Sequence, residues 1–187
     1  KARSGDDAWR IYSKAMGFAN RLVLSEAGAS STNALGLDSA PTSSVINIGT
    51  DTACTNQNNK TYICYAFKNV QGFSKFGTYK GNGNANGVFA FTGFKVGFVM
   101  IKKTDGSENW KIWDNKRPGF NDLNYQQNVN AAEAESDSSN NRLDLLSNGF
   151  KLRGSGDTFN SSGGNYIYMA FAENPFTTST GIPATAG

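Results

Sequence analysis

Short runs of alternating apolar and polar residues predict strands along this chain. Residues Ala8–Tyr12 place Trp9 and Ile11 on one face of an extended segment, and residues Asn109–Trp113 repeat that pattern. The longest apolar run, Val96–Ile101, has the length of one buried strand. No stretch sustains helical periodicity over three turns, so we expect an all-β protein.

The chain also repeats itself. WRIYSKAMGF at 9–18 reappears as WKIWDNKRPGF at 110–120, and YICYAF at 62–67 reappears as YIYMAF at 166–171. The two matches keep the same order at offsets of 101 and 104 residues, which indicates a tandem duplication. We therefore predict an antiparallel β-sandwich, of jelly-roll or lectin-like type, built from two duplicated β-rich units.

The duplication divides the chain into three parts. Residues 1–72 form a first, N-terminally truncated repeat, and residues 73–176 form a second, complete one. Residues 177–187 lack large apolar side chains apart from one isoleucine and are expected to be a flexible tail or linker.

One block of the complete repeat has no counterpart in the first. Residues 68–101 precede the second tryptophan segment, whereas Lys1 already aligns with Lys102. We therefore expect a longer parent polypeptide, or another chain, to supply the missing strands. An upstream relative of residues 76–101 is the sequence that this expectation requires.

Turn-forming residues suggest how neighbouring strands connect. GNGNANG at 81–87 stands between Phe76–Tyr79 and Val88–Phe91, and its Gly and Asn residues suit a hairpin turn better than a phosphate loop, because a strand follows it. In each copy a short strand, Val45–Ile48 or Phe150–Leu152, is expected to form a hairpin with the strand that follows it.

Two further segments complete the local reading. Gln126–Ala134 is a candidate short helix. The closing strands, Tyr62–Phe67 and Tyr166–Phe171, are apolar on nearly every residue, as a strand covered on both faces would be. They are expected at the centre of the fold.

Composition narrows the classes of partner. The net charge of +3 comes without a basic run, which argues against nucleic acid, and no apolar stretch approaches the roughly 18 residues that a membrane span needs. Neither a nucleic-acid partner nor membrane insertion is expected, and no cofactor is implied.

The two cysteines are a candidate disulfide. If residues 57–60 form a hairpin tip, Cys54 and Cys64 face each other on paired strands. The second copy has Thr158 and Tyr168 at these positions, so the bond would be an optional clasp, and two free thiols are the alternative. Two cysteines without histidine make metal binding improbable.

Candidate catalytic residues are absent from the pattern. The chain contains no histidine, so it cannot assemble a Ser-His-Asp or Cys-His arrangement. The carboxylate pairs Asp6 with Asp7 and Glu133 with Glu135 lie in polar loop sequence, where solvated side chains are expected rather than a glycosidase pair. No enzymatic activity is predicted.

The tryptophans are the candidate contact residues. Trp9 and Trp110 alternate with isoleucine and are expected in the core or between sheets. Trp113, which is replaced by Tyr12 in the first copy, faces the other side. An exposed ring there would stack on a sugar or contact another subunit.

Beyond these residues, a set of motifs resembles a repeat domain of virion proteins from tailed bacteriophages, particularly marine ones. The motifs are F-x-x-Y-x-G-N-G, T-G-F-K-x-x-F-V-M-I-K, N-W-x-I-W-D-N-K-R, L-S-N-G-F-K-L-R and Y-I-Y-M-A-F-A-E-N-P-F, carried by Phe76–Gly83, Thr92–Lys102, Asn109–Arg117, Leu146–Arg153 and Tyr166–Phe176. The first copy departs from the pattern at residues 13–16, where DNKR is lost.

This resemblance implies a structural part of a phage particle, in a tail fibre, spike or other external appendage. Its partners would be other virion proteins and further copies of itself, with a trimer favoured. The alternative is a lectin-like module that recognises host-surface glycans through exposed aromatic rings, and a polysaccharide depolymerase is a third, less favoured class. The resemblance supplies no catalytic residues.

Overall fold

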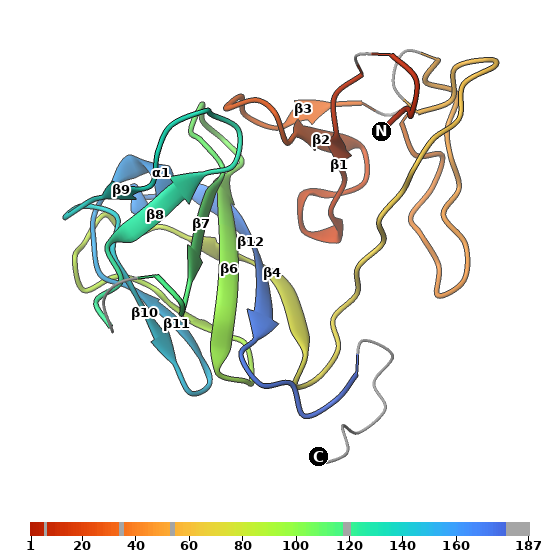
Figure 1. The fold of residues 1–187 in the computed structure, drawn as a ribbon. Coiled ribbons are helices and arrows are strands. Elements are labelled where there is room, and N and C mark those ends of the chain that lie inside the picture. Colours follow the sequence, from red (N-terminus) through yellow and green to blue (C-terminus); the bar gives the residue numbers. More distant parts are fainter. Residues whose placement is uncertain (6, 34–35, 53–54, 118–120, 179–187) are drawn as a thin grey trace.

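The structure is a computed structural model that describes residues 1–5, 7–33, 36–52, 55–117 and 121–178 (Figure 1). The second unit is a sandwich of two antiparallel sheets. One sheet has six strands in the order β4-β12-β6-β7-β8-β9, and the other has three in the order β10-β11-β5. The strands are β4 (Ser74–Lys80), β5 (Phe89–Phe91), β6 (Val96–Lys103), β7 (Lys111–Asp114), β8 (Tyr125–Asn128), β9 (Ser136–Asp137), β10 (Leu143–Leu146), β11 (Gly149–Leu152) and β12 (Asn165–Ala172).

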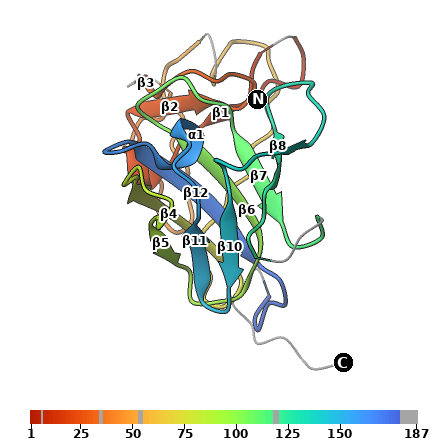
Figure 2. The ribbon, with the colours of Figure 1, turned by 90° about the vertical axis from the view of Figure 1, so that its left-hand side faces the viewer.

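The main core lies between these two sheets, which Figure 2 shows one in front of the other. Tyr168 of β12 meets Phe150 of β11 edge-to-face, with ring centroids 5.1 Å apart. Val99 and Ile101 of β6 and Trp113 of β7 are fully buried in the same core. The all-β sandwich expected from the sequence is therefore the fold of this unit.

Strand β12 is an interior strand of the six-stranded sheet, second in its order, and is buried as its apolar sequence predicts. It pairs along its length with β4 on one side and with β6 on the other. Tyr166, Tyr168 and Ala170 face the main core, while Ile167 faces the opposite side, where it is also buried. Both faces are covered, which explains why apolar residues occupy successive positions.

The hairpin expected between Phe150–Leu152 and the following strand is wrong. Strands β11 and β12 belong to different sheets, and the short helix α1 (Asp157–Asn160) lies between them in the chain. Strand β11 pairs instead with β10 and β5. The candidate helix over Gln126–Ala134 is also wrong, because its first residues belong to β8.

The GNGNANG loop is a crossing between sheets rather than a hairpin turn, because β4 and β5 do not pair with each other. It wraps around the side chain of Asn160, which is fully buried. The Asn160 amide group donates to the Asn82 side chain and to the carbonyl oxygens of Asn84 and Gly154, and its oxygen accepts from the Asn82 N–H. Gly83 adopts a positive φ of 64° within this loop.

The first unit repeats part of this architecture. Its strands β1 (Arg10–Ile11), β2 (Asn20–Val23) and β3 (Ser31–Thr32) form a sheet of their own, and a 3-10 turn (Lys14–Met16) joins the first two. Arg10 pairs with Val23 as Lys111 pairs with Asn128. Sheet β1-β2-β3 is thus the counterpart of β7-β8-β9.

Individual hydrogen bonds recur between the two units as well. Leu24 N–H donates to the Trp9 carbonyl (3.0 Å), and Val129 N–H donates to the Trp110 carbonyl (2.9 Å). The pairing of β2 with β3 matches that of β8 with β9 residue for residue, at one constant offset.

The same holds near the closing segments. Gln57 N–H donates to the Tyr62 hydroxyl (2.9 Å), and Ser161 N–H donates to the Tyr166 hydroxyl (2.8 Å). The duplication inferred from the sequence is therefore visible in the backbone pairing of both units.

Other strands expected in the first unit do not form. Val45–Ile48 is represented by a single bridge between Leu37 and Ile48, and Tyr62–Phe67 by a single bridge between Ala2 and Tyr62. Tyr65 and Phe67 are exposed, so the first closing segment is not at the centre of a sheet. The sequence favours a strand there, but among the described residues no strand flanks it as β4 and β6 flank β12.

The two units meet on the outer face of the six-stranded sheet. Leu22 of β2 packs with Trp110 and Ile167, and all three side chains are buried. The Trp110 ring nitrogen donates to the Val23 carbonyl at 3.0 Å. The core or interface position expected for Trp9 and Trp110 is confirmed for Trp110, whereas Trp9 is only half-buried.

Strand β6 also buries the side chain of Lys102. Its ammonium group donates to the carbonyl oxygens of Lys103 (2.6 Å) and Gly106 (3.4 Å). Burial lowers the pKa of Lys102 from 10.5 to about 8, partly offset by the nearby Glu108 carboxylate.

We expect the unfolding free energy to rise between pH 8 and pH 9.5. In that range the unfolded chain binds more protons than the folded one, because the pKa of Lys102 is lowered on folding. Burial raises the pKa of Tyr79 in the core, so its opposite contribution belongs to higher pH. Lys102→Met should flatten the rise in melting temperatures measured across this range, and Lys14→Met, at an exposed position, should not.

Candidate functional site

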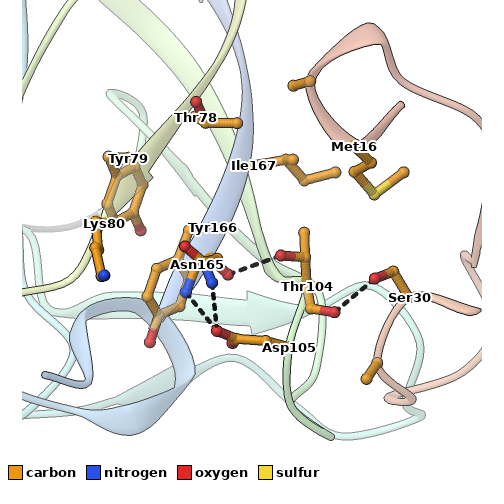
Figure 3. A pocket seen from close by; sticks show the side chains of 12 residues that line it. Met16, Ser30, Thr78, Tyr79, Lys80, Thr104, Asp105, Asn165, Tyr166 and Ile167 are labelled. Carbon is orange, nitrogen blue, oxygen red and sulfur yellow. Dashed lines mark hydrogen bonds between the residues drawn. The ribbon is translucent and has the colours of Figure 1, made fainter. Parts of the chain in front are cut away.

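A cleft of about 580 Å³ opens where the first unit meets the second (Figure 3). Met16 and Ser30 line it from the first unit. The second unit contributes the apolar side chain of Ile167 and a set of polar side chains that includes Thr78, Lys80, Thr104, Asp105 and Asn165.

The second-unit wall is held by the turn that follows β6. Asn165, the first residue of β12, donates from both its backbone N–H (2.9 Å) and its side-chain amide (2.8 Å) to one oxygen of Asp105. Thr104 donates from its N–H (2.8 Å) and its hydroxyl (3.1 Å) to the Asn165 carbonyl. The Asp105 carboxylate is therefore fixed in position although it is exposed.

The first-unit wall is bonded to the same turn. The N–H and the hydroxyl of Ser30 both donate to the Thr104 carbonyl, each at 2.8 Å. Because Thr104 is thus shared by the two units, the width of the cleft depends on how they pack.

Two tyrosines behind the cleft are structural. The rings of Tyr79 and Tyr166 stack with centroids 5.0 Å apart, and their hydroxyl groups donate to the carbonyl oxygens of Phe159 and Asp157, each at 2.6 Å. Burial raises the pKa of both side chains, so they stay protonated donors at neutral pH.

A second, shallower hollow of about 240 Å³ adjoins the same turn. It is lined by Lys103, Ser161 and the backbone of Gly163 and Gly164, and it shares Asp105 with the cleft. A carboxylate that accepts hydrogen bonds, ammonium groups that donate them, and an apolar floor suit a ligand rich in hydroxyl groups.

The structure corrects the expectation for Trp113. Its ring is fully buried against Phe159, with centroids 5.7 Å apart, and its ring N–H has no hydrogen-bond partner. Alternation correctly placed Trp113 of β7 and Trp110, which directly precedes β7, on opposite faces of the sheet, but both faces are covered. Trp113 is therefore not available to a sugar or to another subunit.

Tyr12, its counterpart in the first unit, is half-buried. The Asn33 side chain donates to its hydroxyl at 3.4 Å, and the ring lies against Gly36. A ligand or subunit contact at Tyr12 stays a prediction.

The structure describes only one of the two cysteines of the candidate disulfide. Cys64 is exposed, whereas Cys54 lies outside the described residues. In the complete unit the counterparts Thr158 and Tyr168 lie on α1 and β12, which are not hairpin partners. The hairpin geometry behind the proposed disulfide therefore has no parallel there, and the disulfide itself stays a prediction.

Other chemistries find no site in the described part of the chain. No group of three or more histidine, cysteine, aspartate or glutamate side chains gathers there to hold a metal ion. No helix in that part is long and apolar enough to cross a bilayer. Of the acidic pairs, Glu133 accepts a hydrogen bond from Asn128 and Glu135 pairs with Arg117, while Asp6 lies outside the described residues.

Sequence reasoning missed the cleft. Its polar residues come from segments as far apart as Ser30, Lys80 and Asn165, and no motif links them. The one sequence feature that could have indicated the cleft is the Thr-Asp-Gly turn at 104–106, which follows the longest apolar strand.

Comparison with known proteins gives one family. No curated protein and no solved structure matches the chain. A family model described as a domain of unknown function, DUF7483, matches residues 1–175 and therefore spans both units. The chain belongs to the DUF7483 family.

Proposed function

We propose that this chain is a non-enzymatic structural module of a tailed-phage particle, located in a tail fibre, spike or other external appendage. Its role there is assembly with other virion proteins and with further copies of itself. The resemblance of its motifs to virion repeat domains supports this role. So does the presence of two similar units that stack on one another, as modules of repeat proteins do.

The observation that carries the proposal is the apolar surface that the first unit leaves open. Ile63, Tyr65 and Phe67 are 37%, 63% and 61% exposed, although their counterparts in the second unit lie on β12, which is paired with a strand on each side. Contiguous exposed apolar side chains of this kind favour an interaction surface.

The test is the composition of the particle. Purified virions of the parent phage should yield peptides of this chain by mass spectrometry, and antibodies against it should label an external appendage in electron micrographs. Light scattering of the isolated chain gives its oligomeric state, for which we expect a trimer. Absence of the chain from intact particles would contradict the proposal.

The cleft favours a second candidate function, recognition of a host-surface glycan. Asp105 is exposed yet fixed by Asn165, and Lys80 and Thr78 offer further exposed polar groups beside the apolar Ile167. A sugar presents hydroxyl groups to such side chains and C–H groups to such a floor.

If the cleft binds a glycan, Asp105→Ala should weaken binding of the labelled chain to host cells or to isolated surface polysaccharide by at least about tenfold, because a charge-assisted hydrogen bond contributes roughly 1.5–3 kcal/mol. Glu26→Ala, which removes an exposed carboxylate outside the cleft, is the matched control. Equal binding by both variants would exclude the cleft as the glycan site.

A further inference from the structure

The segment Tyr62–Phe67 is similar in sequence to residues 166–171 of β12, but it lacks the two neighbouring strands with which β12 pairs. Figure 1 shows the segment that leads into β4, residues 55–73, running down the side of the molecule outside the two sheets of the second unit. Ile63 is 37% exposed, whereas its counterpart Ile167 is 8% exposed.

The first residues of this segment nevertheless already pair with the start of the chain as a short antiparallel bridge. Tyr62 pairs with Ala2, the Ile63 N–H donates to the Lys1 carbonyl (3.0 Å), and the Arg3 N–H donates to the Thr61 carbonyl (2.8 Å). In the second unit Tyr166 pairs with Lys103. Since Lys1 aligns with Lys102, these are the same antiparallel register.

In the second unit that register continues along β6 as far as Phe98, beyond which it shifts, and β4 pairs with the other side of β12. In the first unit, no strand among the described residues continues it beside Cys64, Ala66 and Phe67. The block of residues 74–103 that would provide such strands already serves the second unit.

Two aromatic side chains of the segment already pack against rings elsewhere in the protein. The Phe67 ring lies 5.8 Å from that of Phe76 and 6.2 Å from that of Phe171, and the Tyr65 ring stacks on Trp9 at 5.5 Å. These contacts hold the segment at the edge of the molecule, so an incoming strand would meet a partly fixed acceptor.

A second observation points to the same occupant. In the second unit, Trp110 and Ile167 form the face that receives Leu22 of the neighbouring unit. Their counterparts, Trp9 and Ile63, form the equivalent face of the first unit, and there Trp9 is half-buried and Ile63 exposed. In the second unit Trp110 and Ile167 bind the neighbouring unit, whereas their counterparts in the first unit, Trp9 and Ile63, are not fully covered.

We propose that Tyr62–Phe67 accepts a β-strand of the β6 type from a neighbouring unit of the same family. The strand extends the Ala2–Tyr62 pairing in the β6–β12 register, so the counterparts of Ile101, Val99 and Phe98 lie opposite Cys64, Ala66 and Phe67. Strand addition of this kind combines backbone hydrogen bonds with side-chain pockets. The inference gives the proposed assembly role a specific contact and rests on that role for the identity of the partner.

The exposed thiol of Cys64 reports on this contact. In the β6–β12 pairing its counterpart Tyr168 lies opposite Ile101, so an added strand would place the counterpart of Ile101 directly beside the thiol and shield it. In a full-length Cys54→Ser background, we would join Val-Gly-Phe-Val-Met-Ile, the sequence of Val96–Ile101, directly ahead of Lys1 and measure the rate of maleimide labelling. A synthetic peptide copying Phe94–Lys103 tests the same strand added from a separate molecule.

We expect labelling of Cys64 to slow by at least about tenfold in one or both arms, because the side chains of the added strand cover the thiol unless the pairing opens locally. Hydrogen exchange of the backbone amides of Cys64–Phe67 should slow in parallel. The same strand with the Met100→Pro change loses the N–H that would bond to Tyr65, because Lys1 and Ile63 form a hydrogen-bonded pair and such pairs alternate along the ladder, and it should have no such effect.

Unchanged labelling and exchange in both arms would overturn the strand inference. That result would leave the virion role standing, because detection of the chain in purified particles tests the role independently. Conversely, a chain absent from particles could still accept the strand, so the two failures are distinguishable.

Discussion

Asn160→Asp is expected to destabilise the second unit by about 3–5 kcal/mol at neutral pH, the cost typical of an uncompensated buried charge. The amide nitrogen of Asn160 donates to three oxygen atoms, at 3.1, 2.9 and 2.8 Å from the Asn82 side chain and the Asn84 and Gly154 carbonyls. In the variant a carboxylate oxygen replaces that donor. Three attractive contacts become repulsive in a site without solvent.

Urea unfolding followed by circular dichroism measures this cost. Asn86→Asp is the matched control, because it makes the same chemical change at an exposed position of the GNGNANG loop that Asn160 holds, and it should shift stability by less than about 0.5 kcal/mol. The penalty at Asn160 should shrink at acidic pH, where the new carboxyl group takes up a proton and can donate one hydrogen bond. A difference below about 1 kcal/mol between the variants at pH 7 would contradict the role of Asn160 as the centre of the loop.

The role of Asn160 also shows where sequence reasoning stopped. GNGNANG was expected to be a hairpin turn because its residues suit one, and Gly83 does adopt a positive φ. The groups that hold the loop come instead from Asn160, far along the chain, and local composition carries no record of that contact. Strands β4 and β5 therefore enter different sheets, although a tight turn would have paired them.

The sequence predicted strands well where the neighbouring strands that pair with them are present in the described residues. The strands predicted at 76–79, 96–101 and 166–171 lie within β4, β6 and β12, and the sequence also placed Trp113 of β7 and Trp110, which precedes β7, on opposite faces. The same reasoning failed for Tyr62–Phe67, whose sequence is almost that of β12. Strand preference depends on neighbours that bury the segment, and a single segment cannot reveal whether they exist.

The candidate site was beyond sequence reasoning for a related reason. The cleft exists because Ser30 of the first unit bonds to Thr104 of the second, at the junction formed by Leu22, Trp110 and Ile167. The duplication indicated two similar units, but only the structure shows which faces meet. Asp105 acquires its fixed orientation from Asn165, which comes 60 residues later in the chain.

Trp113→Ala is the second large expected effect, a loss of about 3–5 kcal/mol, as for other buried tryptophans cut back to alanine. The ring is fully buried between the two sheets and packs against Phe159, so its removal leaves a cavity that the rigid sandwich fills poorly. A loss of this size is comparable with the whole stability of a small domain, about 5–15 kcal/mol.

Trp113→Phe separates the contribution of ring packing from the cost of the unpaired indole N–H at this position. The indole N–H of Trp113 is buried without a partner, and leaving such a group unpaired costs about 1–3 kcal/mol. Phenylalanine removes that group along with part of the ring volume, so the two effects oppose each other. We therefore expect Trp113→Phe to cost much less than Trp113→Ala in chemical unfolding, and to leave any binding to cells or polysaccharide unchanged. If Trp113→Phe unfolds normally but loses such binding, the indole takes part in recognition, and the sandwich must open to expose it.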